Sequence, residues 1–171
     1  MSFTEAIKTC LSKYVTFEGR ARRSEYWWFF LFVLLVVLVA SLIDSALFGV
    51  DPETGQPGRL LVPLAQLALF LPMLAAGWRR MHDTDRRGIL LLLPMLVSFV
   101  IMLIMTLGVL GAGAMMRAGQ TPEQMMQPTM LLGAGVLMVL WFVQIVLAIL
   151  MLWWLTRPSD PGTNEYGPPP A

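Results

Sequence analysis

The stretch "RRMHDTDRRG", residues 79–88, decides how this chain is organised. It holds four arginines, two aspartates and the only histidine of the 171-residue chain. It stands between two long runs without a charged side chain, residues 60–78 and 88–116. The core of a lipid bilayer takes about 20 consecutive apolar residues per helix and disfavours charge. The stretch therefore predicts a polar connection between two transmembrane helices.

Composition extends this interpretation to the whole chain. Hydrophobic residues make up 57% of it and charged residues only 13%, against roughly 25% charged in a typical soluble domain. Two more charge-free runs cover residues 26–43 and 124–156. We therefore predict an all-α membrane protein that is a single four-helix domain, with transmembrane helices over 26–48, 60–78, 89–113 and 129–155.

The net charge and the number of cysteines exclude several classes of protein. The formal net charge of +1 gives no case for nucleic-acid binding, and a single cysteine excludes an intrachain disulfide and any multi-cysteine metal site. Residues 1–25 are polar and basic without a small-residue cleavage site, so the first span is expected to be retained rather than cleaved as a signal peptide.

Positive side chains gather on one side of the predicted spans. Ten of the twelve Lys and Arg residues precede the first span, join the second to the third, or follow the fourth; Arg59 and Arg117 are on the other side. Loops richer in Lys and Arg stay in the cytoplasm, so both termini are expected there. Most tryptophans stand at the same ends, where an amphipathic ring prefers the headgroup level.

The segment before the first span is expected to form a short amphipathic helix over 3–17. Ser2 and Glu5 fit a capping box at its start. The helix either lies on the inner leaflet or packs against the spans, and we favour the leaflet because the helix carries lysines beside its apolar stripe. Residues 157–171, rich in Pro and Gly, are expected to be a short extended cytoplasmic tail. The apolar stripe recurs at helical spacing at Phe3, Ile7, Leu11 and Tyr14.

Three fragments at membrane boundaries resemble one bacterial family. They are "FEGRARRSEYWWFFLF" (17–32), the 79–88 stretch and "GTNEYGPPP" (162–170). In this order they resemble the small inner-membrane family known as domain of unknown function 805, which implies an architecture and a location but no activity. Asp85 and Arg87 stand where the family usually has small residues. The matching positions are Gly19, Arg20, Arg22, Ser24, Glu25, Tyr26, Trp27, Arg79, Arg80, His82, Asp83, Thr84, Gly88, Asn164, Tyr166 and Gly167.

Metal binding and catalysis are weak interpretations of the 79–88 stretch. A metal site would use His82, Asp83 and Asp85, but transition metals generally want several His or Cys ligands, and the arginines would repel a cation. A catalytic pair of His82 and Asp83 has no marked nucleophile, since Ser24 and Thr84 are candidates in name only. We expect no enzyme, no metal site and no cofactor.

The other interpretations concern the arginines themselves. A guanidinium matches the oxygens of a phosphate, and each basic residue just inside the membrane gains about 1 kcal/mol from anionic lipid. The plainer interpretation, favoured for this loop, is a topology anchor whose arginines pair with nearby carboxylates. The three fragments are expected to meet in one cytoplasmic-face cluster. Candidates for an anionic ligand or lipid headgroup are Arg20, Arg22, Arg23, Arg79, Arg80, Arg86 and Arg87, and the cluster is expected to be organised by Glu25, His82, Asp83, Asn164 and Tyr166.

A transport function would need ionisable residues inside the bilayer, and only Asp44 qualifies. We expect it near the outer end of the first span, with Gln66 as a hydrogen-bond partner. Gln144 is the other polar residue well inside a span. An oligomeric channel or small-solute transporter that uses these three residues is the alternative function.

Methionine is concentrated in the loop before the fourth span. Thioethers suit Cu(I), but Met is common in apolar helices, so packing is the favoured explanation. The five residues concerned are Met115, Met116, Met125, Met126 and Met130.

Taken together, the sequence favours an integral inner-membrane accessory protein. It would contact membrane lipids, with anionic headgroups as one option, or dock an unknown membrane or cytoplasmic protein through its basic face. A homo-oligomer stays open.

Overall fold

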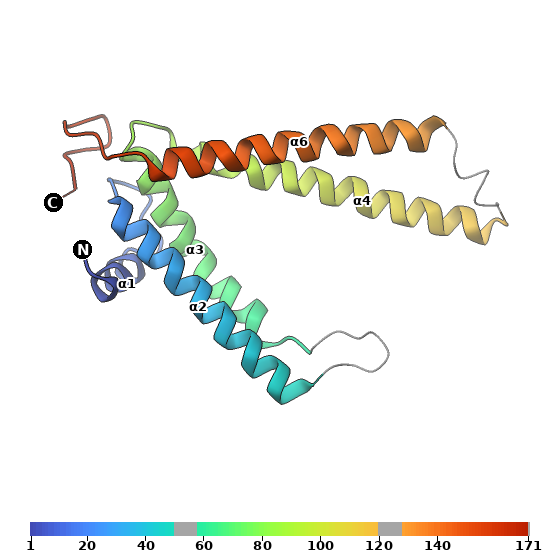
Figure 1. Cartoon of the computed structure of the whole chain (residues 1–171), viewed down its shortest axis with the longest axis horizontal. Helices are drawn as coiled ribbons and strands as arrows, with labels where there is room; N and C mark the ends of the chain where they lie inside the picture. The colour runs from blue at the N-terminus through green and yellow to red at the C-terminus, as the bar shows by residue number, and fades with distance from the viewer. Residues whose placement is uncertain (50–57, 120–127, 171) are drawn as a thin grey trace. The chain divides into compact units, whose positions relative to one another are not determined.

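The computed structural model describes residues 1–49, 58–119 and 128–170 of the chain. These residues form helices and contain no named strand (Figure 1). Four helical segments are long and apolar enough to cross a membrane: Arg23–Phe48, Leu61–His82, Gly88–Arg117 and Gly133–Thr156. The prediction of an all-α membrane protein with four transmembrane helices is confirmed. The elements are α1 (Phe3–Ser12), α2 (Arg23–Phe48), α3 (Leu61–His82), the 3-10 helix η1 (Gly88–Leu92), α4 (Leu93–Arg117) and α6 (Pro128–Thr156).

Burial in this chain is inverted relative to a soluble protein. Arg79, Arg80 and Asp83 are 0% exposed, whereas Leu42 in α2 and Val109 in α4 are 62% and 69% exposed. Exposing a leucine side chain to water costs free energy, but exposing it to lipid does not, because lipid tails are as apolar as the side chain itself. The long helices therefore turn apolar surface outward, and these three charged side chains are enclosed by the chain.

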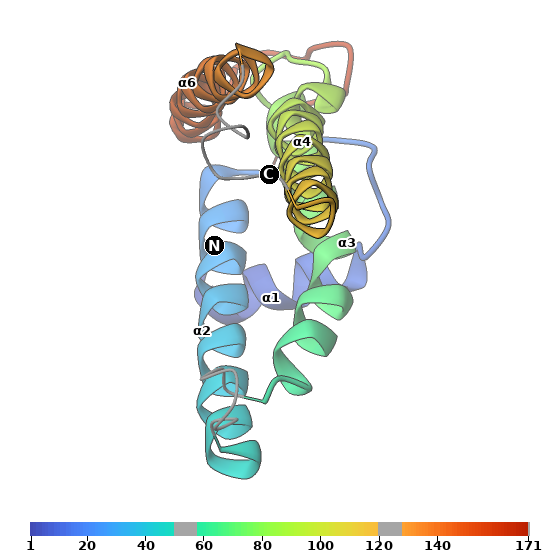
Figure 2. The same ribbon diagram turned by 90° about the vertical axis from the view of Figure 1, so that its right-hand side faces the viewer.

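The helices divide into two compact units. Residues 1–88 and 154–171 make up the first unit, with α1, α2, α3 and the C-terminal tail. Residues 89–153 make up the second, with α4 and most of α6. Within the first unit α2 and α3 run antiparallel beside each other, and α1 packs against both (Figures 1 and 2).

The N-terminal helix packs against the spans α2 and α3. Ser2 and Glu5 form the predicted capping box. The helix ends at Ser12 rather than at residue 17, because the chain turns over residues 13–15. Its buried face is formed by Ala6 and Cys10, both 0% exposed, whose small side chains allow a close approach. The predicted stripe is only partly engaged: Phe3 and Ile7 are half-buried, while Leu11 and Tyr14 are 40% and 36% exposed.

Tyr14 nevertheless makes a specific contact with α3. Its hydroxyl donates to the carbonyl of Ala68. In a regular helix that carbonyl would accept the N–H of the residue four positions later, which here is Pro72 and has none. The tyrosine thus satisfies a backbone acceptor that the proline leaves open, and this ties the N-terminal segment to the middle of a span.

In the second unit α4 and α6 face each other. The Nε2 of Gln144 donates to the hydroxyl of Ser98 at 3.1 Å. Gly108 and Ala112 of α4 and Gly133 of α6 line an apolar groove together with larger side chains. A Cβ added at Gly108 or Gly133 would meet no atom within 4 Å, so these glycines do not mark a close helix contact. Of the Met-rich loop, Met125 and Met126 lie outside the described residues, as does the side chain of Met130.

Candidate functional site

The charged stretch is partly helix and partly loop. Helix α3 continues to His82, beyond the predicted end at residue 78, so Arg79 and Arg80 belong to its last turn. Basic side chains are favourable there because the helix dipole places partial negative charge at its C-terminus. The chain then turns over residues 83–85, and Asp85 takes a positive φ of 55°.

Asp83 is the centre of the cluster. Its Oδ1 accepts from Nε of Arg20 at 3.0 Å, and its Oδ2 accepts from Nη1 of Arg80. All three side chains are at most 1% exposed. One buried carboxylate is therefore shared by two guanidinium groups, one from the segment before α2 and one from the end of α3.

Arg20 also holds the C-terminal tail. Its Nη1 donates to the carbonyls of Gly162 and Gly167 at 2.7 and 3.2 Å, and its Nη2 donates to the carbonyl of Asp160 at 2.6 Å. The tail is folded back rather than extended, with a bridge between Asn164 and Gly167. Backbone carbonyls of the tail thus complete the hydrogen bonding of a buried arginine.

Arg80 connects the same centre to the end of α6. Its Nε donates to the carbonyl of Leu155 at 3.1 Å, and its Nη2 donates to the carbonyl of Arg157. The last carbonyls of a helix have no partner within that helix, so a guanidinium is a suitable cap for them. Arg80 therefore joins the ends of α3 and α6.

His82 and the tail cover one side of the cluster. The imidazole stacks on the ring of Tyr166, with 3.8 Å between ring centroids and 6° between planes. Its Nδ1 lies 3.2 Å from the carbonyl oxygen of Gly19, which can only accept, so Nδ1 carries the proton in this arrangement. The amide of Asn164 donates to the backbone carbonyl of His82 at 2.8 Å. The histidine is a packing residue between two chain segments.

Arg79 makes a second buried pair. Its Nη1 lies 3.0 Å from Oε1 of Glu25, and both side chains are at most 5% exposed. Among the described residues neither terminal nitrogen of Arg79 makes a well-oriented hydrogen bond, so the pair is held by charge more than by geometry. The thiol of Cys10 lies 3.8 Å from the same carboxylate. Burial, with the charge of Glu25, raises the pKa of this thiol to about 12.

The remaining arginines form a rim around these buried groups. Arg23 and Arg87 are exposed, and Arg22 and Arg86 are half-buried. Arg22 donates to the carbonyl of Pro170 at 3.3 Å from two of its nitrogens. Arg86 lies over the ring of Trp154, 5.3 Å from its centroid, which is cation–π geometry. Burial and the charge of Arg157 lower the pKa of Arg86.

The three fragments predicted to meet are brought together in this unit. The buried members, which we call the arginine cluster, are Arg20, Glu25, Arg79, Arg80, His82, Asp83 and the folded tail with Asn164 and Tyr166. The rim consists of Arg22, Arg23, Arg86 and Arg87. Within the cluster the arginines are paired internally, so a ligand would have to reach the rim.

The intramembrane polar residues play other parts. Asp44, 1% exposed, accepts the backbone N–H groups of Leu60, Leu61 and Val62 at 2.9–3.2 Å. These are the donors at the start of α3 that lack a partner within their own helix. The expected pairing of Asp44 with Gln66 is wrong, since both carboxylate oxygens are used by the backbone and Gln66 is exposed. Gln144 belongs to the other unit.

His82 and Asp83 do not form a catalytic pair. The imidazole faces Gly19 and Tyr166, while the carboxylate faces two arginines. The hydroxyl of Thr84 donates to the carbonyl of Met81 at 3.1 Å. Among the described residues no group of three or more His, Cys, Asp and Glu side chains could hold a metal ion.

Several contacts went unnoticed in the sequence. An ideal Cβ at Gly88 would overlap the indole of Trp78, so the glycine permits a close approach of the loop to α3. The partners of Arg20 in the tail are backbone carbonyls, which have no sequence signature. The bond from Tyr14 did have a signal: a proline inside a predicted span orphans the carbonyl four residues before it.

These features define a four-span α-helical membrane protein with a closed ionic cluster at one end of its first unit. The chain belongs to the family described as "Protein of unknown function (DUF805)", whose profile matches residues 14–124, more than half of the chain. Residues 157–170, the folded tail, follow that matched segment.

Two relatives of this chain are inner-membrane proteins of Escherichia coli. "Inner membrane protein YhaI" of Escherichia coli (strain K12) is 40% identical over 78 residues, which cover 46% of this chain and 60% of YhaI. "Inner membrane protein YhaH" of the same strain is 36% identical over 94 residues, which cover 53% of this chain and 75% of YhaH. The match therefore spans less than two thirds of YhaI. No solved structure matches.

Proposed function

We propose that this protein is a non-catalytic accessory of the bacterial inner membrane that contacts anionic lipid headgroups through the rim of its cytoplasmic face. One observation carries the proposal: the cluster arginines are buried and paired within the chain, so among the seven candidate arginines only those of the rim are exposed or half-buried. The cluster is the scaffold that holds the loop, the segment before α2 and the tail in place. The rim is the part that would contact lipid headgroups.

The orientation supports this role. Ten of the twelve Lys and Arg residues fall on the side of the cluster, and such loops stay in the cytoplasm. The cytoplasmic leaflet carries a negative surface potential that attracts basic residues by about 1 kcal/mol each. With Cys10 replaced by Ser, a single cysteine at the exposed Ala118 should react with an impermeant thiol reagent in intact cells, whereas one at Arg87 should not. Labelling at Arg87 alone would reverse the assigned orientation.

The transport alternative is less well supported. Its central residue, Asp44, is used to cap the start of α3, which gives the carboxylate a structural reason to be there. Gln66 is exposed on α3, and Gln144 donates to Ser98. Asp44 therefore has a structural role without an ion pathway, whereas Oε1 of Gln144 has no hydrogen-bond partner among the described residues.

Lipid enrichment tests the proposal. The full chain would be extracted with its neighbouring lipid in polymer-bounded discs, and the ratio of phosphatidylglycerol to zwitterionic lipid compared with the bulk membrane. Replacing Arg22, Arg86 and Arg87 by Gln should lower the enrichment and its sensitivity to salt. The matched control replaces Arg59 and Arg117, which lie on the opposite side. An unchanged enrichment in the first variant would refute the proposed function.

A further inference from the structure

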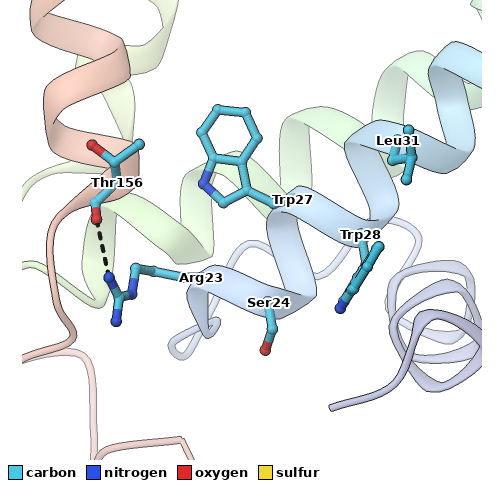
Figure 3. A pocket seen from close by; sticks show the side chains of 6 residues that line it. All are labelled: Arg23, Ser24, Trp27, Trp28, Leu31 and Thr156. Carbon is cyan, nitrogen blue, oxygen red and sulfur yellow. Dashed lines mark hydrogen bonds between the residues drawn. The ribbon is translucent and has the colours of Figure 1, made fainter.

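One rim arginine borders a pocket that the cluster does not use. The pocket has a volume of about 460 Å³ and lies at the start of α2 (Figure 3). Its position in the first unit keeps all its walls within one body. The lining residues are Arg23, Ser24, Trp27, Trp28, Leu31 and Thr156.

Arg23 and Ser24, on the polar side of the pocket, have hydrogen-bond donors that the described residues do not use. Arg23 makes one hydrogen bond with the described residues, from Nη1 to the carbonyl of Thr156, and at 3.4 Å it is long (Figure 3). Arg20, by contrast, uses every nitrogen of its guanidinium. The hydroxyl of Ser24 makes no hydrogen bond within the described ranges. A planar fork beside a free hydroxyl matches the oxygens of a phosphate.

The other walls are apolar and lead away from the charge. Trp27 and Trp28 supply indole rings, which prefer the headgroup level of a membrane. From Ser24 a stripe at helical spacing runs down α2, and its members are exposed: Trp28 at 40%, Leu31 at 37%, and Leu35 at 42%. It continues through Leu38 and Leu42 at 51% and 62%. A pocket with an arginine and a serine at one end and apolar walls that continue into a long apolar stripe fits an amphiphile better than a soluble ion.

We propose that this pocket binds one anionic phospholipid, with its phosphate between Arg23 and Ser24 and an acyl chain along the exposed stripe of α2. The proposal deepens the proposed function by naming a discrete site, and it rests on the same cytoplasmic-leaflet orientation. A zwitterionic headgroup fits less well, because its cationic end would meet the positive charges of the rim.

Native mass spectrometry of the full chain in mild detergent tests the site. Purified protein would be titrated with phosphatidylglycerol or with phosphatidylcholine. We expect one phosphatidylglycerol to be retained in preference to phosphatidylcholine. Replacing Arg23 by Gln and Ser24 by Ala should weaken that retention about tenfold or more, the size expected for losing charge-assisted hydrogen bonds. The matched control is Arg117→Gln, an exposed arginine that belongs neither to the pocket nor to the rim. Equal retention of both lipids, or an undiminished level in the Arg23/Ser24 variant, would overturn the proposal.

Two further arms separate the site from its rivals. Inorganic phosphate in large excess should leave the bound lipid in place; displacement would mean that the pocket takes a free anion, which also overturns the proposal. Phosphatidylglycerol with brominated chains should quench tryptophan fluorescence less in Trp28→Phe than in Trp141→Phe. Equal quenching in the two variants would place the chain elsewhere.

The outcomes distinguish this site from the proposed function. If the Arg22/Arg86/Arg87 variant loses general enrichment while the Arg23/Ser24 variant retains its lipid, the rim contacts lipid and the discrete site is refuted. If the Arg22/Arg86/Arg87 variant keeps its lipid enrichment while the Arg23/Ser24 variant loses the single bound lipid, the discrete site is supported and the proposed lipid contact of the rim is refuted.

Discussion

Removing the charge of Asp83 should destabilise the protein more than any other change in the 79–88 stretch. Asp83→Asn keeps the shape of the side chain but leaves the guanidinium groups of Arg20 and Arg80 facing a neutral amide. Because all three side chains are at most 1% exposed, water does not screen the loss. Breaking a buried ion pair by removing one partner costs about 3–5 kcal/mol.

The size of the effect makes the prediction measurable. For a chain of this length each kcal/mol corresponds to roughly 2–4 °C in melting temperature, so the expected drop is about 6–20 °C. Thermal unfolding in mild detergent can be followed by tryptophan fluorescence and by the fraction that remains monodisperse on size exclusion. Adding Arg20→Gln to Asp83→Asn should cost less than the sum of the single changes, because the pair is coupled.

Asp85→Asn is the matched control for this experiment. Asp85 lies two residues away in the same turn, but it is exposed and has a φ of 55°, a region in which Asn is readily accommodated. Its replacement should leave the melting temperature nearly unchanged. If Asp83→Asn melts within the same range as Asp85→Asn, the shared carboxylate does not hold the cluster together and our reasoning fails.

Three further predictions concern single contacts of the first unit. Tyr14→Phe should lower the free energy of unfolding by about 1–3 kcal/mol, because it leaves the Ala68 carbonyl without a donor. The same change should be nearly neutral in a Pro72→Ala background, where residue 72 supplies the N–H. An equal loss in both backgrounds would contradict this prediction. Cys10, whose thiol pKa is raised to about 12 chiefly by burial, should react with maleimide at pH 8 only after denaturation, so rapid labelling of the folded protein would count against its burial. Asp44→Asn should lower the melting temperature, since an amide has one acceptor oxygen where the carboxylate uses two; a variant with unchanged melting and lost transport would revive the channel alternative.

The sequence predicted the spans because their signal is local. Runs such as residues 26–43 need no knowledge of the rest of the chain, and the Ser2–Glu5 capping box lies within four residues. The meeting of the three fragments was also predictable, since their charges fall at the same predicted membrane boundary. The predicted end of the second span, at residue 78, falls before the end of α3 at His82, because Arg79 and Arg80 resemble loop residues by composition although they continue the helix.

The pairing of individual groups could not be predicted. Arg20 is completed by carbonyls of Asp160, Gly162 and Gly167, and every residue offers such a carbonyl. For Asp44 the sequence predicts only an interfacial carboxylate, because nothing in the sequence shows that the first N–H groups of α3 come within its reach. In both cases one partner is backbone, so residue types alone leave the contact undetermined.

The division between cluster and rim decides how mutations in this family member should be interpreted. Arg20 donates to one carboxylate and to three carbonyls of the tail, and lysine, with three donors on a point charge, cannot reproduce that fork. Substitution of Arg20, Arg79 or Arg80 will therefore disturb the loop and tail before it disturbs any ligand, and a lost activity there says little about binding. Rim residues such as Arg23 and Arg87 are exposed, so their replacement can change what the surface binds while the buried pairs keep the fold. A binding defect at the rim with an unchanged melting temperature is consequently the observation that would connect this structure to a function.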